Sequence, residues 1–109
     1  MKSLLRLILL LTATASVIAH AQYPNRPVRL VVPFAAGSAT DSIARVVAQA
    51  LTERLGQPMI VDPKAGASGQ IAAEFVARAA PDGYTLFMTT NTSHSANPAM
   101  FRKLPYDPI

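Results

Sequence analysis

Three short apolar segments, separated by two stretches with helical spacing, constrain the fold of this chain more than any other feature. The apolar segments span residues 28–32, 59–61 and 84–88. Between them, apolar residues recur every three or four positions over residues 38–55 and 70–79. Short apolar strands that alternate with helices are typical of parallel β-α-β units with right-handed crossovers. The sequence therefore predicts an α/β protein built on a parallel β-α-β-α-β unit.

The ends of the first helix can be read from the sequence. Ser38 is the predicted N-cap, since Asp41 follows it by three residues, and Gly56 and Pro58 are expected to end the helix. Its apolar residues repeat at helical spacing and predict the face that packs on the sheet: Ile43, Val46, Val47, Ala50, Leu51 and Leu55. The stripe expected for the second helix is Ile71, Ala72, Phe75, Val76 and Ala79.

Residues 1–21 are predicted to be a secretory signal peptide. Lys2 and Arg6 precede an apolar run, which closes on Ala19-His20-Ala21, a cleavage pattern with small residues on both sides. A membrane anchor is the alternative, but this run is shorter than the ~20 apolar residues that a span requires. We therefore expect export, with cleavage after Ala21.

The composition excludes several classes of site. Without residues 1–21, eight basic and six acidic residues leave a net charge of +2, with no basic cluster that would bind nucleic acid. The chain has no cysteine, which excludes disulfides and thiolate metal sites. After cleavage His94 is the one remaining histidine, and the loops contain no paired carboxylates. We expect no catalytic residue, no metal site and no cofactor.

The loop after the first strand, residues 34–41, is small and rich in hydroxyl groups. In an open parallel sheet, ligands bind beyond the carboxyl ends of the strands. The start of a helix offers unpaired N–H groups and a partial positive charge, so this loop could hold a carboxylate without an arginine. The alternative is that Ser38 and Asp41 only cap the helix. Phe34 is a candidate for the wall of a ligand site.

Two further loops follow the other predicted strands. Gly66 and Gly69 match neither common phosphate-binding pattern, so residues 63–69 are expected to form a tight turn into a helix. Residues 90–95 are polar and contain four possible hydrogen-bond donors: Asn91, Thr92, Ser93 and His94. A lone histidine is more often structural than catalytic, and Ser93 beside His94 makes no catalytic triad.

Three stretches of the sequence resemble the periplasmic receptors of tripartite tricarboxylate transporters, the Bug-type solute-binding proteins of bacteria. They are YPNRPVRLVVPFAAGSATDSIAR, LGQPMIVDPKAGASGQIAAEFVARAAPDGYTL and NPAMFRKLPYDP. The resemblance implies a type II periplasmic binding-protein fold, in which residues 22–109 form part of the first lobe. It also implies a periplasmic protein that captures a small organic carboxylate, with the membrane subunits of the transporter as possible partners.

The resemblance further implies where the ligand binds. The carboxylate is expected on the loop after the first strand, held partly by backbone N–H groups and water, and the polar loop after the third strand is expected to line the same cleft. The predicted ligand-binding residues are Phe34, Ala35, Ala36, Gly37, Ser38, Thr40, Asp41, Asn91, Thr92, Ser93 and His94. The chain departs from the family where Ala36 and Ala39 flank its single Gly37, because the extra Cβ atoms restrict the backbone.

Receptors of this family are considerably longer than this chain. We therefore expect a fragment that lacks the second lobe, folds marginally and binds its ligand weakly by itself. Two alternatives remain open. One is a truncated product without function, and the other is a small Rossmann-like enzyme in which only Asp41 and His94 could serve as catalytic groups.

Overall fold

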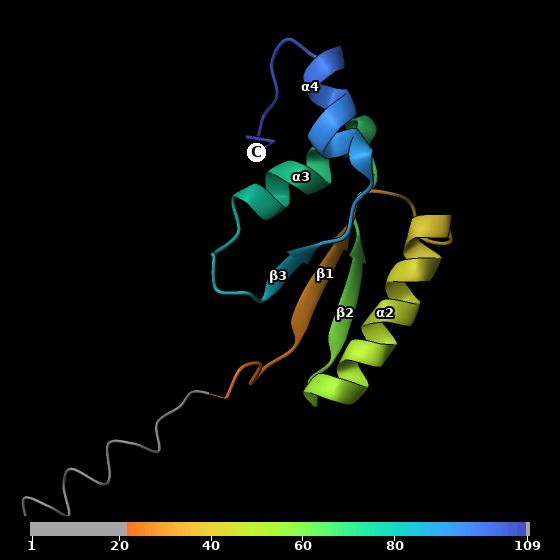
Figure 1. Cartoon of the computed structure of the whole chain (residues 1–109), viewed down its shortest axis with the longest axis vertical. Helices are drawn as coiled ribbons and strands as arrows, with labels where there is room; N and C mark the ends of the chain where they lie inside the picture. The colour runs from red at the N-terminus through yellow and green to blue at the C-terminus, as the bar shows by residue number, and fades with distance from the viewer. Residues whose placement is uncertain (1–21, 109) are drawn as a thin grey trace, which may run out of the picture.

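The computed structural model describes residues 22–108, so the predicted signal peptide and its cleavage site lie outside the described residues. Its one sheet has three strands: β1 (Val28–Val32), β2 (Met59–Pro63) and β3 (Thr85–Phe87). The strand order is β2-β1-β3, and β1 pairs in parallel with both neighbours (Figure 1). The predicted parallel β-α-β-α-β unit is confirmed.

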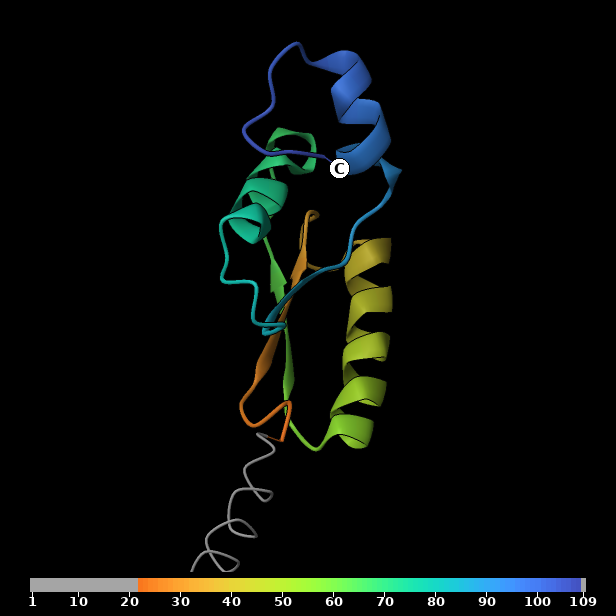
Figure 2. The same cartoon turned by 60° about the vertical axis from the view of Figure 1, so that its left-hand side comes forward.

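Two helices connect the strands and cover opposite faces of the sheet. The helix α2 (Ala39–Leu55) joins β1 to β2, and α3 (Gln70–Ala77) joins β2 to β3. Figure 2 shows the sheet between these two helices. A short 3₁₀ turn, η1 (Ala67–Gly69), precedes α3, which confirms the expected tight turn into a helix.

The polar segment after β3 is helical rather than a loop, so that part of the sequence interpretation is wrong. It forms a π-helical turn, η2 (Thr92–Ala96), which continues directly into α4 (Asn97–Met100). The helical turn expected at Asn97 and Pro98 is confirmed, but it begins several residues earlier than predicted. Thr and Ser have modest helix propensity, so contacts with the rest of the fold decide this conformation.

Both predicted ends of α2 are confirmed. Ser38 is extended (φ −67°, ψ 163°), and its hydroxyl accepts a hydrogen bond of 3.2 Å from the backbone N–H of Asp41. At the other end Gly56 is left-handed, with φ +70°, and its N–H donates to the carbonyl of Thr52 at 3.0 Å. A side chain at Gly56 would be strained in this conformation, which explains why glycine ends the helix there.

The core lies between α2 and the sheet. It contains the alternate residues Val28, Leu30 and Val32 of β1, together with Met59 of β2. From α2 it receives Ala44 and Ala48, which are 0% and 4% exposed. Two small side chains one turn apart allow the helix to approach the β-branched residues of the strand closely.

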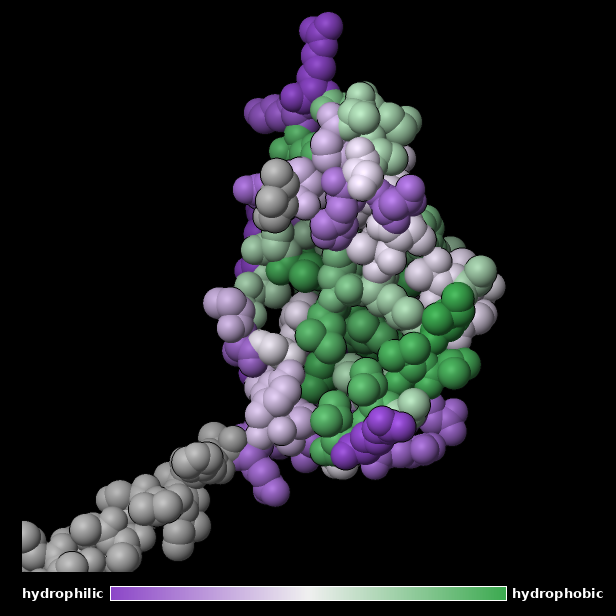
Figure 3. Space-filling model, in the orientation of Figure 1, coloured by the Kyte–Doolittle hydropathy of each residue, from purple (hydrophilic) through white to green (hydrophobic). Residues whose placement is uncertain are grey.

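The face of α2 that packs on the sheet is rotated from the predicted one, although Leu51 of the predicted stripe does pack against the core. Ile43 and Val46 are 56% and 70% exposed, and Val47 is 37% exposed, although all three belong to the predicted core stripe. The helix carries two neighbouring apolar stripes, and periodicity cannot tell which one faces the sheet. The stripe with the two alanines is buried, and the larger residues contribute to an apolar surface over α2 and the adjoining sheet (Figure 3).

Two alanines on α2 distinguish the observed packing from the predicted one. Ala48→Leu forces a larger side chain against β1 and β2, and we expect it to lower the free energy of unfolding by about 1–3 kcal/mol. Ala50→Leu makes the same change at an exposed position and should alter stability by no more than about 0.5 kcal/mol. Urea unfolding followed by circular dichroism measures both, and equal losses in the two variants would contradict this orientation of α2.

Candidate ligand-binding site

The segments that follow the three strands meet at one end of the sheet. Figures 1 and 2 show the loop after β1 and the chain after β3 at the same end, where α2 begins. The second loop contacts both, because a Cβ atom at Gly69 would lie 3.1 Å from Ser93 Oγ and 3.2 Å from Pro33 Cβ. Gly69 also has φ +82°, so this junction requires glycine for its conformation as well as for its space.

The loop after β1 is a tight turn held by its own backbone. The N–H of Ser38 donates to the carbonyl of Ala35 at 3.1 Å, and Gly37 has φ +84°. The N–H of Gly37 points to the following helix and donates to Asp41 Oδ2 at 2.9 Å. These bonds fix the turn that leads into α2, and they occupy the Gly37 donor within the protein.

Asp41 is buried at the start of α2, with 2% of its surface exposed. The guanidinium of Arg45, one helical turn later, donates to both of its carboxylate oxygens, from Nε at 2.9 Å and from Nη2 at 3.2 Å. The hydrogen bond from Arg45 lowers the pKa of Asp41, and the bond from the Gly37 N–H lowers it further. Asp41 therefore stays ionised, and its charge is neutralised within the loop.

Several N–H groups of this loop make no hydrogen bond within the described part of the chain. Three of them belong to Ala36, Ala39 and Thr40, and the last two lie in the first turn of α2. Ala36 and Ala39 are exposed, and Thr40 is half-buried. Unpaired N–H groups at a helix N-terminus attract an anion, and the side chains around them are too small to exclude one.

The four candidate donors after β3 differ in their accessibility. Asn91 and His94 are exposed, whereas Thr92 is half-buried. Ser93 is fully buried, and its hydroxyl lies 3.2 Å from the hydroxyl of Thr89. Ser93 is therefore packed into the fold, and the exposed side chains on either side of it are the ones that a solute can reach.

Phe34 and Ala35 lie at the exit of β1, where Phe34 is half-buried and Ala35 is exposed. Of three hollows on the described surface, none is lined by residues 34–41. The smallest, about 150 Å³, is lined partly by Phe87, His94 and Tyr106. Residues 35–37, 39, 91 and 94 of the candidate site are exposed on the described part of the chain.

Sequence reasoning missed three residues that shape this end of the molecule. Arg45 could have been identified, because a basic residue four positions after an acidic one on a helix is a recognised ion-pair spacing. Asn97 and Tyr106 could not, because their contacts join distant parts of the chain: Asn97 Nδ2 donates to the carbonyl of Ser68 at 3.0 Å. No local sequence pattern predicts such a contact.

The described residues show no cluster of three or more potential metal ligands. Over residues 22–108, no helix is both long and apolar enough to cross a membrane.

Comparison with known proteins identifies relatives for most of the chain. The family model described as tripartite tricarboxylate transporter family receptor (TctC) matches residues 43–109. A UPF0065 protein of Bordetella pertussis is 46% identical over 100 residues, which cover 91% of this chain and 30% of that protein. The chain therefore spans about 30% of the length of this curated relative.

Three solved structures share the fold. The periplasmic binding protein BugD has a TM-score of 0.71 and 41% identity, over 79% of this chain and 28% of its own. An R. palustris protein solved with adipate has a TM-score of 0.76 and is 44% identical to this chain. MatC from Rhodopseudomonas palustris with bound malate has a TM-score of 0.74 and is 45% identical. Each of the last two matches covers 79% of this chain and 29% of the other. The chain belongs to the TctC family of tripartite tricarboxylate transporter receptors, which are binding proteins and not enzymes.

Proposed function

We propose that this chain forms part of the first lobe of a periplasmic receptor that captures a small organic carboxylate for a tripartite tricarboxylate-type transporter. Export would follow cleavage after Ala21, and the membrane subunits of the transporter would be its partners. Membership of the receptor family supports this proposal. Two structural relatives were solved with dicarboxylates, adipate and malate, and both align with most of this chain.

The observation that carries the proposal is the set of unpaired N–H groups on residues 36, 39 and 40 at the exit of β1. A carboxylate oxygen can accept hydrogen bonds from such groups, and the N-terminal end of a helix dipole stabilises its charge. Asp41 does not repel the ligand strongly, because Arg45 neutralises it at 2.9 Å. Backbone geometry and the pairing of one buried charge thus support a carboxylate as the ligand.

The second set of proposed contacts comes from the segment after β3. Asn91 and His94 are exposed polar side chains at the same end of the sheet and could contact the rest of the solute. Phe34 could pack against its apolar part. Binding sites usually bury most of a small ligand, and the exposed residues of this candidate site would bury only one side of it. We therefore expect weak binding by this chain alone.

A titration of the isotopically labelled 109-residue chain tests this function. Malate and adipate should bind with a Kd of about 1 mM or weaker, which corresponds to about −4 kcal/mol or less favourable binding. The amide signals that shift should be those of residues 35–40 and 91–94. The neutral diamide of adipate is the control ligand, and it should cause no comparable shifts because it lacks the charge that the helix N-terminus attracts.

A variant can remove one of the proposed donors without changing the helix. Proline is tolerated at the first helical position, and Ser38 before it already has extended dihedral angles, so Ala39→Pro deletes one N–H and keeps α2. We expect about tenfold weaker carboxylate binding, in line with a lost bond to a charged group. Ala39→Gly keeps the N–H and should bind like wild type; equal affinity of both variants would rule out this donor.

A second prediction concerns the clamp between Asp41, Gly37 and Arg45. Because the pKa of Asp41 lies below its usual 3.8, the ionised carboxylate stabilises the fold above about pH 4. This contribution is lost as the pH falls from 4 through the lowered pKa. Asp41→Asn should therefore have a lower Tm than wild type at pH 7, and the difference should narrow between pH 4 and pH 2.

Thermal unfolding at several pH values measures this difference. Glu53→Gln is the matched control, since it neutralises an exposed carboxylate near the other end of the same helix. Its Tm should stay close to that of wild type at pH 7. Should Asp41→Asn and wild type show the same Tm at every pH, the buried carboxylate would have no stabilising role in the loop.

A further inference from the structure

A buried polar network joins the segment after β3 to two distant parts of the chain. The hydroxyl of Tyr106 donates to the backbone carbonyl of Ser93 at 2.7 Å. The same hydroxyl accepts a hydrogen bond of 3.1 Å from Asn97 Nδ2, which also donates to the carbonyl of Ser68 at 3.0 Å. Two side chains thus connect η1, η2 and the C-terminal tail.

Two of the three residues in this network are fully buried. Asn97 and Ser93 are both 0% exposed, and Tyr106 is half-buried. Asn97 Oδ1 has no partner among the described groups, so the two bonds donated by Nδ2 hold its amide in place. In such a site, loss of one bond leaves buried polar atoms unpaired, which costs more than an exposed bond is worth.

The segment that the network supports has little conformational preference of its own. The turn η2 is π-helical, which is a rare geometry, and Thr92, Ser93 and Ser95 are not strong helix formers. On its other side Ser93 Oγ lies 3.2 Å from the hydroxyl of Thr89, and it fills the space that a Cβ atom at Gly69 would need. Tertiary contacts through Ser93 therefore set the position of Asn91 and His94, its exposed neighbours.

We propose that Tyr106 and Asn97 are positioning residues for the ligand site: they hold residues 91–94 beside the start of α2. This inference rests on the proposed carboxylate-binding function. Neither residue has to touch the solute, since both act through the backbone carbonyl of Ser93 and the loop at Ser68.

Tyr106→Phe tests the proposal, because it removes the hydroxyl and keeps the ring. We expect amide hydrogen exchange at residues 92–96 of the 109-residue chain to become about three- to tenfold faster, with no such change in α2 or β1. Carboxylate affinity measured with malate should fall by a similar factor. Asn97→Ala should speed exchange in the same segment, and the double variant should add little to the larger single effect if the two residues act as a unit.

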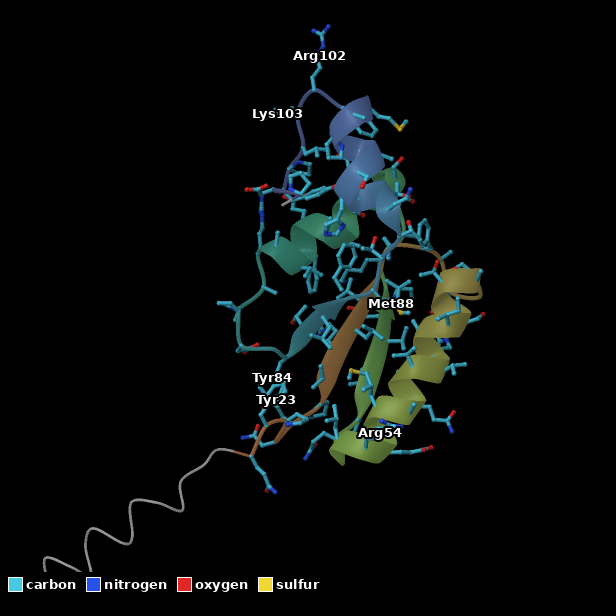
Figure 4. The ribbon with its side chains drawn as sticks, in the orientation of Figure 1. Tyr23, Arg54, Tyr84, Met88, Arg102 and Lys103 are labelled. Atoms are coloured by element: carbon cyan, nitrogen blue, oxygen red, sulfur yellow. The ribbon has the colours of Figure 1, made fainter. Side chains whose placement is uncertain are left out.

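Tyr23→Phe is the matched control. The hydroxyl of Tyr23 also donates to a backbone carbonyl, that of Gly83 at 2.5 Å, and its ring packs edge-on against Tyr84 with 5.1 Å between the ring centroids. Figure 4 shows Tyr23 and Tyr84 at the end of the sheet opposite the candidate site. This variant also removes a hydrogen bond from a tyrosine hydroxyl to a backbone carbonyl, but far from η2, so it should leave exchange at residues 92–96 and malate affinity unchanged.

The two readouts separate this inference from the proposed function. The positioning role would be overturned if Tyr106→Phe left amide exchange at residues 92–96 unchanged, or if it accelerated exchange equally throughout the chain. This holds whether or not the chain binds malate. Unchanged malate affinity, with faster local exchange, would show that residues 91–94 do not contribute to binding and would also overturn it. If wild type binds no carboxylate, the proposed function fails, and exchange alone then decides whether Tyr106 holds η2.

Discussion

The central position of β1 determines the arrangement of this protein. The strand is hydrogen-bonded in parallel on both sides, and the residues directly after β2 and β3 also bond to it: Lys64 N–H donates to the carbonyl of Val32 at 2.7 Å, and Met88 N–H donates to that of Val31 at 2.9 Å. Parallel pairing forces all three strands to end at the same edge of the sheet. Segments that are distant in sequence therefore meet at this end of the sheet, where Pro33 and Ser93 leave no room for a side chain at Gly69.

Whether this end of the sheet can attract an anion depends on how the negative charge of Asp41 is paired. A helix N-terminus attracts anions, and Asp41 already occupies the first turn of α2. The carboxylate is turned inward, toward the N–H of Gly37 and the guanidinium of Arg45, so it stabilises the turn and leaves other N–H groups of the loop unpaired. Capping and anion binding, which are alternatives when only the sequence is considered, are compatible here because they use different donors.

Several features could be predicted because they depend on neighbours along the chain. The capping bond of Ser38, the glycine end of α2 at Gly56 and the spacing of Asp41 and Arg45 all involve residues within one helical turn. The face of α2 could not be predicted, since Ala44 and Ala48 are buried and Val46 is exposed although both stripes are apolar. That choice depends on how closely the helix can approach the β-branched side chains of β1, which periodicity does not describe.

By itself, the sequence determined the strands, the ends of α2, the small, hydroxyl-rich loop after β1 and the family resemblance. Each of these depends on residues that are close together along the chain. Tertiary structure alone decided that residues 92–96 are helical, that Ser93 is buried and that Tyr106 reaches it through a hydrogen bond of 2.7 Å. The physical reason is that these properties come from contacts between residues 13 or 29 positions apart, such as Tyr106 with Ser93 and Asn97 with Ser68. Such pairs have no local signature, and only the folded sheet brings them together.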